Sequence, residues 1–301
     1  MKTSTTNILV FLSLLVPSTL FAQTEDRFSI WESLKVTDAA FAERSRTLGM
    51  NQAFLDVFGD GAVIFRRGPV DARLLYEQVS PDQRRNSFLE SKANYIDFSR
   101  SGDLGLTSGP YRFSSGSGEE MRRVYGHFVN IWRQVDGEWR MVADMVVSVP
   151  GFLSLDVEPD FAETELLIAE TAPANLAINN TVDSLLEADR RYVASINIRG
   201  GRRTASRFGI NHQRIYIPGM APGIGNESGS LIYGAFLDEK VAMSTLTFES
   251  AGAVMAESGE VGYTYGTMHV EGADFNTNYL RYWHFTKSGE WKVAVEVLSP
   301  Y

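Results

Sequence analysis

The fold of this chain is decided by the stretch YGHFVNIWRQVDGEWR, residues Tyr125–Arg140. Side chains in Tyr125–Gln134 alternate between apolar and polar types, which is the period of a β-strand. Asp136-Gly137 then supplies the residues that a tight turn with positive φ requires, and a second strand follows over Trp139–Val147. The stretch therefore predicts an antiparallel hairpin.

The same pattern occurs a second time further along the chain. Three blocks recur in the same order: residues 33–68 with 184–219 at an offset of 151, Gly102–Gly109 with Gly259–Gly266 at an offset of 157, and Asp136–Arg140 with Ser288–Lys292 at an offset of 152. A repeat of this length indicates a duplicated domain rather than a solenoid, whose units have about 20–50 residues.

Each copy begins with an amphipathic helix. Its apolar stripe holds Trp31, Leu34, Phe41 and Ala42 in the first copy and Val182, Leu185, Leu186, Tyr192 and Val193 in the second. In the first copy Pro69 suits the first turn of a further helix that ends near Gln78, whereas the second copy is expected to have the loop Met220–Gly225 in its place. Helices followed by antiparallel strands predict an α+β fold.

Composition and charge exclude several classes of protein. The chain has 301 residues, of which 44% are hydrophobic, so it can form a globular core and two domains of about 100–200 residues each. Its 28 Lys and Arg against 37 Asp and Glu give a net charge of −9, which argues against nucleic acid as a partner. The absence of cysteine excludes disulfides, thiolate nucleophiles and thiolate zinc sites.

The first residues have the pattern of a targeting segment. Lys2 precedes the apolar run Ile8–Val16, which is too short to span a bilayer but typical of a signal peptide, and Ala22 offers a small residue for cleavage. We therefore expect residues 1–22 to be a signal peptide and the protein to be periplasmic or secreted, with no membrane anchor.

Two of the blocks resemble a known family. Gly102–Gly105 followed by Tyr125–Arg140 is similar to the DUF4440 branch of the NTF2-like, or SnoaL-like, superfamily. The resemblance implies two tandem cone-shaped domains, residues 27–150 and residues 179–301, joined by a linker at 151–178. In each, N-terminal helices would pack on a strongly bent antiparallel sheet and enclose a mostly apolar pocket.

The resemblance also bears on chemistry. Ketosteroid isomerases of this superfamily carry a catalytic Asp late in the strand that here reads Ala62–Arg67. Arg66 takes that position in the first copy and Ile217 in the second, which argues against isomerase chemistry.

Two acids interrupt the helix stripes at equivalent positions. Asp38 lies between Leu34 and Phe41, and Asp189 lies between Leu185 and Tyr192, so each carboxylate is expected to point to the buried side. Burial without a partner would raise the pKa of such a carboxyl and make it a general acid or base. The alternative is a structural Asp that hydrogen bonds within the fold.

A second pair of acids lies on the last strand of each copy. Arg140 and Asp144 are expected to share one strand face, and Lys292 with Glu296 repeats both charge and spacing. Pointing inward, Asp144 and Glu296 could accept a substrate proton or hold a ligand hydroxyl. Pointing outward, they would form exposed ion pairs worth about 0–1 kcal/mol.

Histidine and glycine patterns add little chemistry. His127 lies in the strand Tyr125–Gln134 and is either a hydrogen-bonded wall residue or a base. His269 and His284 are expected several residue pairs apart, and H-E-x-x-H is missing, so no metal site is predicted. Gly223–Gly225 lacks the strand and helix context of a phosphate-binding loop, so no cofactor is expected.

Two functions stay open. The first is binding of a small, partly apolar molecule in the first cone, or service as an interaction module. The candidate contacts are Trp31, Phe41, Tyr76, Tyr111 and Trp132 in the first copy and Asp189, Tyr216, Tyr265, Tyr282 and Glu296 in the second. The second function is a cofactor-independent lyase, isomerase or hydrolase that transfers protons through Asp38, His127 and Asp144. We expect the two copies to pair within one monomeric chain.

Overall fold

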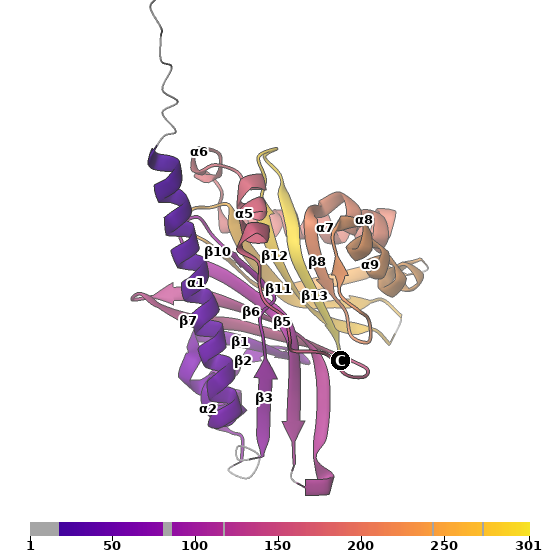
Figure 1. Ribbon diagram of the computed structural model, residues 1–301. Helices are drawn as coiled ribbons and strands as arrows, with labels where there is room; N and C mark the ends of the chain where they lie inside the picture. The colour runs from indigo at the N-terminus through magenta and orange to yellow at the C-terminus, as the bar shows by residue number, and fades with distance from the viewer. Residues whose placement is uncertain (1–17, 81–85, 117, 243, 273) are drawn as a thin grey trace, which may run out of the picture.

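The computed structural model describes residues 18–80, 86–116, 118–242, 244–272 and 274–301 (Figure 1). The predicted signal peptide at 1–22 falls mostly outside this part of the chain and stays a prediction. Among the described residues, no helix is both long enough and apolar enough to cross a membrane.

The described residues of the first half build a seven-stranded sheet with three α-helices and one 3₁₀ helix. Its elements are α1 (Ser18–Thr47), α2 (Met50–Val57), β1 (Phe58–Arg66), β2 (Gly68–Asp71), α3 (Ala72–Glu77), β3 (Ser87–Ser91), β4 (Tyr95–Phe98), β5 (Leu104–Ser115), the short 3₁₀ helix Gly118–Glu120, β6 (Arg122–Val135) and β7 (Glu138–Val149). The strand order is β2-β1-β7-β6-β5-β3, with β4 also paired to β5. All pairs are antiparallel except β1 with β7.

The second half repeats this order. Its elements are α7 (Val182–Arg199), α8 (Gly201–Phe208), β8 (Gly209–Tyr216), β9 (Gly223–Ile224), α9 (Asn226–Val241), β10 (Leu246–Met255), β11 (Val261–Val270), β12 (Asn276–Phe285) and β13 (Trp291–Pro300). The strands follow the order β9-β8-β13-β12-β11-β10, and β8 pairs parallel with β13 as β1 does with β7. The predicted α+β fold and both predicted hairpins are confirmed.

Two expectations about the third helix were wrong. Pro69 lies in β2, and α3 begins at Ala72 with the Asp71 side chain accepting the Leu74 N–H as its cap. The second half does not replace this helix by a loop, because the segment Met220–Gly225 contains β9 and is followed by α9, which is longer than α3.

The first helix of each half packs on its sheet through the same contact. A Cβ atom built on Gly105 would lie 2.6 Å from Leu34 Cδ2, and one built on Gly262 would lie 2.6 Å from Leu185 Cδ2. A larger residue would force the leucine to shift, so the glycine lets it lie directly on the strand. Because this contact recurs, each helix acid is held over its sheet in the same place.

A bulge in the last strand of each half changes which face its side chains occupy. Ile131 pairs with Ala143 but Trp132 pairs with Met141, so Val142 is an extra residue in β7. Met141 lies in the core between helices and sheet, whereas Ala143 lies on the opposite face. The prediction that Arg140 and Asp144 share a face was therefore wrong.

The second half has the equivalent bulge. Tyr282 pairs with Val295 and Trp283 pairs with Val293, which leaves Ala294 extra. Past the bulge, Glu296 lies on the face covered by the helices, as Asp144 does in the first half. The inward alternative for both acids is the observed one. We call the space between helices and sheet the first cone (α1–α3) and the second cone (α7–α9).

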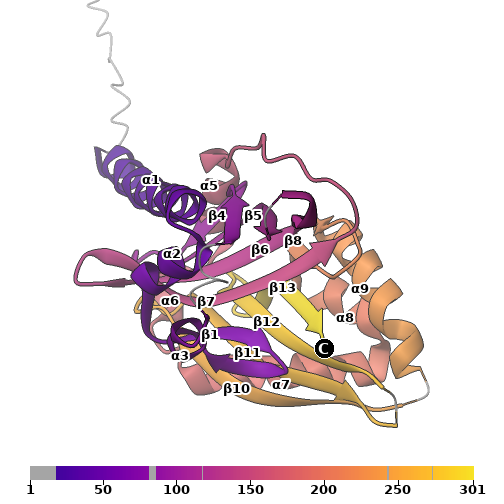
Figure 2. The ribbon, with the colours of Figure 1, turned by 90° about the horizontal axis from the view of Figure 1, so that it is seen from below.

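The two sheets pack against each other through their other faces (Figure 2). One buried cluster contains Leu106, Ile131 and Met145 from the first sheet together with Leu280 and Val297 from the second. The helices of each half lie on the outer side of its own sheet (Figures 1 and 2). The sheets therefore cover each other's apolar faces within one chain.

Equivalent residues meet each other at this contact. Ser101 and Ser258, which match in the repeat, lie 2.7 Å apart through their hydroxyls, and each backbone N–H donates to the other's hydroxyl. The Arg100 N–H donates to Glu260, and in return the Glu257 N–H donates to Asp103. Reciprocal contacts of this kind define a pseudo-two-fold axis between the halves.

Residues 151–178, predicted as a linker, contain the helices α5 (Phe161–Glu170) and α6 (Ala174–Ala177). The Thr164 hydroxyl donates to the Ile96 carbonyl in β4, and Glu163 accepts two hydrogen bonds from Arg214 in β8. The segment thus bridges both halves. The exact domain boundaries stay a prediction.

One buried ion pair crosses between the sheets. His284 Nε2 lies 2.7 Å from Asp97 Oδ2, and both side chains are buried. Burial opposes a charge on His284, but Asp97, together with the charges of Glu260 and Glu170, outweighs it and raises the pKa of the imidazole above its ordinary value. The pair therefore favours a protonated histidine inside the interface.

We expect Asp97→Asn to lower the free energy of unfolding by about 3–5 kcal/mol, because it leaves a buried imidazolium without its partner. Since the His284 pKa is raised in the folded state, this stabilisation is complete below the unfolded pKa of about 6.5 and is lost as pH rises through the folded pKa. Denaturant unfolding from pH 5 to pH 9 measures it. The exposed Asp183→Asn is the control, and equal stability of the two variants would contradict the assignment.

Candidate functional site

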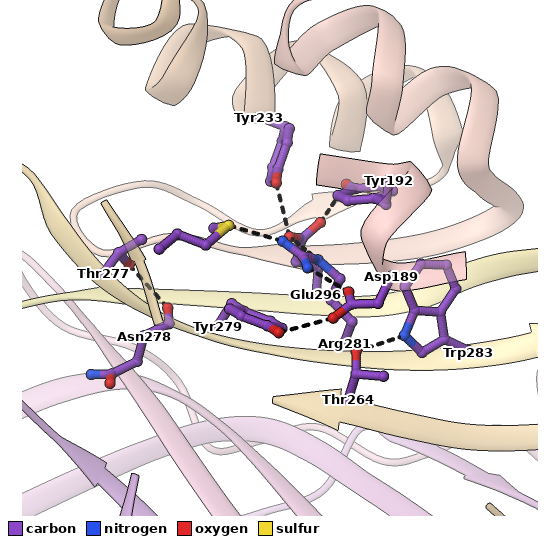
Figure 3. A network of polar contacts seen from close by, with 11 residues as sticks. Asp189, Tyr192, Tyr233, Thr264, Thr277, Asn278, Tyr279, Arg281, Trp283 and Glu296 are labelled. Carbon is purple, nitrogen blue, oxygen red and sulfur yellow. Dashed lines mark hydrogen bonds and ion pairs between the residues drawn. The ribbon is translucent and has the colours of Figure 1, made fainter. Parts of the chain in front are cut away.

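The second cone is filled by a buried ionic network (Figure 3). Arg281 in β12 donates to Asp189 of α7 at 2.6 Å and to Glu296 of β13 at 2.8 Å, and all three side chains are fully buried. The hydroxyl of Tyr192 also donates to Glu296, at 2.5 Å, and that of Tyr279 donates to Asp189, at 2.8 Å. A network with every member paired stabilises one arrangement of the helix on the sheet.

Further side chains close around the same guanidinium. The Arg281 guanidinium carbon lies 4.6 Å from the Tyr192 ring centre and 4.2 Å from that of Tyr279. From α9, Tyr233 donates to Glu296 at 2.9 Å. The Asp189 and Glu296 carboxylates, predicted as ligand contacts, therefore both bind the protein's own arginine.

Three other predicted ligand contacts lie outside the second cone. Tyr216, Tyr265 and Tyr282 belong to the cluster between the sheets, and the Tyr216 hydroxyl accepts a hydrogen bond from Ser108 at 2.5 Å. Along β12, Tyr279 and Arg281 face the cone, so strand alternation turns Tyr282 to the other side. These residues join the halves and do not line the second cone.

The first cone has the same acids but a different residue between them. In register, Thr107 and Asp144 flank Asn130, just as Thr264 and Glu296 flank Arg281. Asn130 therefore takes the place of Arg281. The helix acid and the strand acid are kept, and the cation that neutralises them in the second cone is replaced by a neutral amide.

Asp38 reaches into the first cone from α1. Its Oδ1 accepts a 2.6 Å hydrogen bond from the Thr107 hydroxyl, which accepts a 2.9 Å bond from Trp132 Nε1. Burial raises the pKa of Asp38 to about 6, although hydrogen bonding to Thr107 and Asn130 opposes the rise. The carboxyl is thus both a member of a local network and a titrating group near neutral pH.

Asp144 is the second carboxyl of the first cone. Burial raises the pKa of Asp144 to about 7, and the nearby Arg66 guanidinium offsets this only in part. Burial and the charge of Asp144 raise the pKa of Tyr111 to about 12, and the same two causes raise the pKa of Tyr76. The charge of Asp144 therefore acts on both phenols.

Asn130 lies between the two carboxyls and is itself incompletely paired. Its side chain is 2% exposed, and its Oδ1 has no hydrogen-bond partner within the described part of the chain. A buried amide oxygen without a donor costs about 1–3 kcal/mol. The first cone thus contains a hydrogen-bond acceptor that the fold leaves unused.

His127 does not join this group. It shares a strand face with Val129 and Ile131, which lie between the sheets, and its ring centre is 5.6 Å from that of Tyr216. Burial lowers the pKa of His127 to about 4, so the imidazole is neutral at physiological pH. The predicted grouping of His127 with Asp38 and Asp144 was wrong, because alternation along β6 sends the histidine to the opposite face.

The remaining predicted residues of the first copy lie in the core of the first cone. Phe41, Tyr76, Tyr111 and Trp132 belong to one buried cluster. Trp31 belongs to it too, about two turns before Asp38 in α1, and its ring lies 5.6 Å from that of Phe161 in α5. Asn130 and Arg281 were missed by the sequence analysis, although the offset of 151 that pairs the helices also pairs these two residues.

A surface pocket of about 450 Å³ leads to Asp38. It opens between α1 and the break that separates β3 from β4. Its charged lining consists of Lys35, Asp38, Glu43, Arg46, Glu90, Lys92 and Glu158. Asp38 is part of this lining, although only 1% of the residue is exposed.

No family model matches the chain, and no curated protein matches it. Solved structures that are similar include a ketosteroid isomerase-like protein from Erwinia carotovora atroseptica, with 13% identity over 40% of this chain and 97% of that chain and a TM-score of 0.34. An NTF2-like protein from Cytophaga hutchinsonii shows 15% identity over 40% of this chain and 99% of that chain, with a TM-score of 0.32.

A third solved structure is an NTF2-like protein with a cystatin-like fold from Novosphingobium aromaticivorans. Its identity is 13% over 46% of this chain and 87% of that chain, with a TM-score of 0.34.

The described residues contain no group of three or more His, Cys, Asp or Glu side chains placed to hold a metal ion. The chemistry that the first cone can supply itself comes from two carboxyls, one amide and two phenols.

We expect opposite effects on stability from the two strand acids. Asp144→Asn removes a carboxyl whose folded pKa of about 7 exceeds the ordinary 3.8, so the variant should gain about 1–3 kcal/mol at pH 8. Wild-type stability should fall as pH rises from about 4 to about 7, because the folded state holds the Asp144 proton more tightly than the unfolded state.

The matched variant Glu296→Gln should lose about 3–5 kcal/mol, since it removes one partner of the buried Arg281. Urea unfolding of both variants at several pH values measures the difference. A loss of stability in Asp144→Asn as large as that in Glu296→Gln would contradict the contrast between the cones.

Proposed function

We propose that the first cone binds a small, partly apolar molecule, with Asp38 and Asp144 as its polar anchors. The observation that supports this most is that the first cone has Asn130 where the second cone has Arg281, in each case between two acids. In the second cone Arg281 pairs with both carboxylates, whereas in the first cone a neutral amide lies between them.

The surroundings of the two carboxyls favour a ligand with an apolar part. Phe41 and Trp132 pack near Asp38, and Tyr76 and Tyr111 lie near Asp144. Binding sites for small molecules combine apolar walls of this kind with a few convergent polar groups. The pocket beside Asp38 supplies an entrance.

The binding function is tested by thermal-shift screening against a broad library of small apolar and amphipathic molecules. We expect hits that raise the melting temperature of the wild-type chain and lose their effect in the Asp38→Asn, Asp144→Asn double variant. Hits of equal size in the wild type and the double variant, or none in the whole library, would refute binding in the first cone.

A second candidate is proton transfer to and from carbon. It is favoured by the pKa values of about 6 for Asp38 and about 7 for Asp144, which lie where a general acid or base works best at neutral pH. His127 takes no part in this version, because it faces the other side of the sheet.

This candidate predicts hydrogen–deuterium exchange at the α-carbon of small ketones such as cyclohexanone, followed by proton NMR in D₂O. The rate should rise through the pKa of the carboxylate that acts as base and drop at least about 100-fold in Asp144→Asn or Asp38→Asn. Exchange no faster than in buffer with equal carboxylate would exclude it, while leaving the binding function untouched.

A further inference from the structure

The second cone provides an internal template for the occupant of the first. There, the Arg281 guanidinium lies between two carboxylates, at 2.6 Å from Asp189 and 2.8 Å from Glu296. It also lies over the rings of Tyr192 and Tyr279, at 4.6 Å and 4.2 Å from their centres. This is a complete binding site for an organic cation, with its cation built in.

The first cone keeps these surroundings. The equivalents of the two acids and the two aromatic rings, at offsets of 151 or 152, are Asp38, Asp144, Phe41 and Phe128. Phe41 and Phe128 both lie in the buried cluster of the first cone. Acids and aromatic rings are thus retained while the arginine is not.

The residue that replaces the arginine points to the kind of ligand. Asn130 is 2% exposed, and its Oδ1 has no donor among the described residues. An unpaired acceptor beside two carboxyls calls for a ligand that carries both positive charge and N–H groups. A neutral apolar molecule would leave the Asn130 acceptor without a donor and both carboxyls without a cation.

We propose that the first cone binds a small organic cation with N–H donors, an alkyl- or arylammonium or a guanidinium, whose charged head takes the place that the Arg281 guanidinium holds in the second cone. This inference rests on the proposed binding function and names its ligand class. Asp144 and Asp38 would pair with the head, Asn130 would accept an N–H, and Phe41 with Phe128 would face the cation.

The protein's own cations near the site do not complete it. Arg66, the cation that acts on Asp144, is exposed on β1 and donates to the Phe65 carbonyl. At the entrance, Arg46 pairs with Glu43 and Lys92 pairs with Glu158. Neither of these pairs leaves a free cation to occupy the position between Asp38 and Asp144.

The experiment is isothermal titration calorimetry on the full chain at pH 8 and low salt. The probes are benzylammonium and methylguanidinium, the neutral benzyl alcohol, and tetramethylammonium, which has charge but no N–H. We expect the first two to bind, and tetramethylammonium to bind at least about tenfold more weakly because it cannot donate to Asn130 or the carboxylates.

Two variants tie binding to the first cone. Asp144→Asn should weaken the benzylammonium affinity at least about tenfold, whereas the exposed control Asp183→Asn, which removes the same charge, should leave it unchanged. Asn130→Arg should rebuild the network of the second cone, abolish cation binding and raise the melting temperature by about 2 °C or more.

The outcomes separate this inference from the proposed function. Binding of benzyl alcohol without binding of the cations overturns the cationic ligand class and leaves small-molecule binding in place. Cation binding that survives both Asp144→Asn and Asn130→Arg places the site elsewhere and overturns the inference. If no probe binds, the cation inference is overturned, and the library screen decides whether any binding function remains. If Asn130→Arg does not fold, Asp144→Asn decides alone.

Discussion

A carboxylate buried in an apolar cone must be accompanied by a cation, a proton or a ligand, because a lone buried charge costs several kcal/mol. Both halves of this protein place two carboxyls at equivalent positions, one from the first helix and one from the last strand, and of the four only Asp144 is half-buried rather than buried. The second half accompanies them with Arg281, and three tyrosines complete the network. The first half has Asn130 in that position, and burial raises the pKa of both its acids, to about 6 for Asp38 and about 7 for Asp144.

Two backbone features bring these acids together. The glycines under Leu34 and Leu185 let the first helix of each half lie on its sheet, which places the helix acid over the strands. The bulges at Val142 and Ala294 then turn Asp144 and Glu296 toward that helix. Without the bulge, strict alternation would send the strand acid to the contact between the sheets, where the buried cluster is apolar. The site therefore depends on one irregularity of the backbone that occurs twice.

The sequence was sufficient to predict the parts of the fold that follow a regular period. Helix stripes, strand alternation and the Asp136-Gly137 turn gave the helices, the hairpins and the repeat, and the inward direction of Asp38 and Asp189 followed from helical spacing. Alternation failed for Asp144, because an extra residue in a strand leaves no mark in the pattern of apolar and polar residues. It failed for Tyr282 because both faces of its sheet are buried, so an aromatic side chain fits either face.

The missed residues show a different limit. Arg281 and Asn130 align in the repeat. A buried arginine in a strand can be recognised, however, only when the two acids that pair with it are known to lie beside it. Those acids are about 90 and 15 residues away in the chain. Convergence of this kind is a property of tertiary structure.

Tandem arrangement gives the difference between the cones a physical rationale. Each sheet has one face that must be covered by another sheet, and the reciprocal contacts around Ser101 and Ser258 hold the two halves in that position. A half that is fully paired, like the second cone, stabilises this contact. The other half can then keep acids that no cation neutralises. A lone domain of about 120 residues has a net stability of only about 5–15 kcal/mol, so the same acids would reduce it by a larger fraction. The stability of the second cone and the acids without a cation in the first cone are therefore linked through the contact between the two sheets.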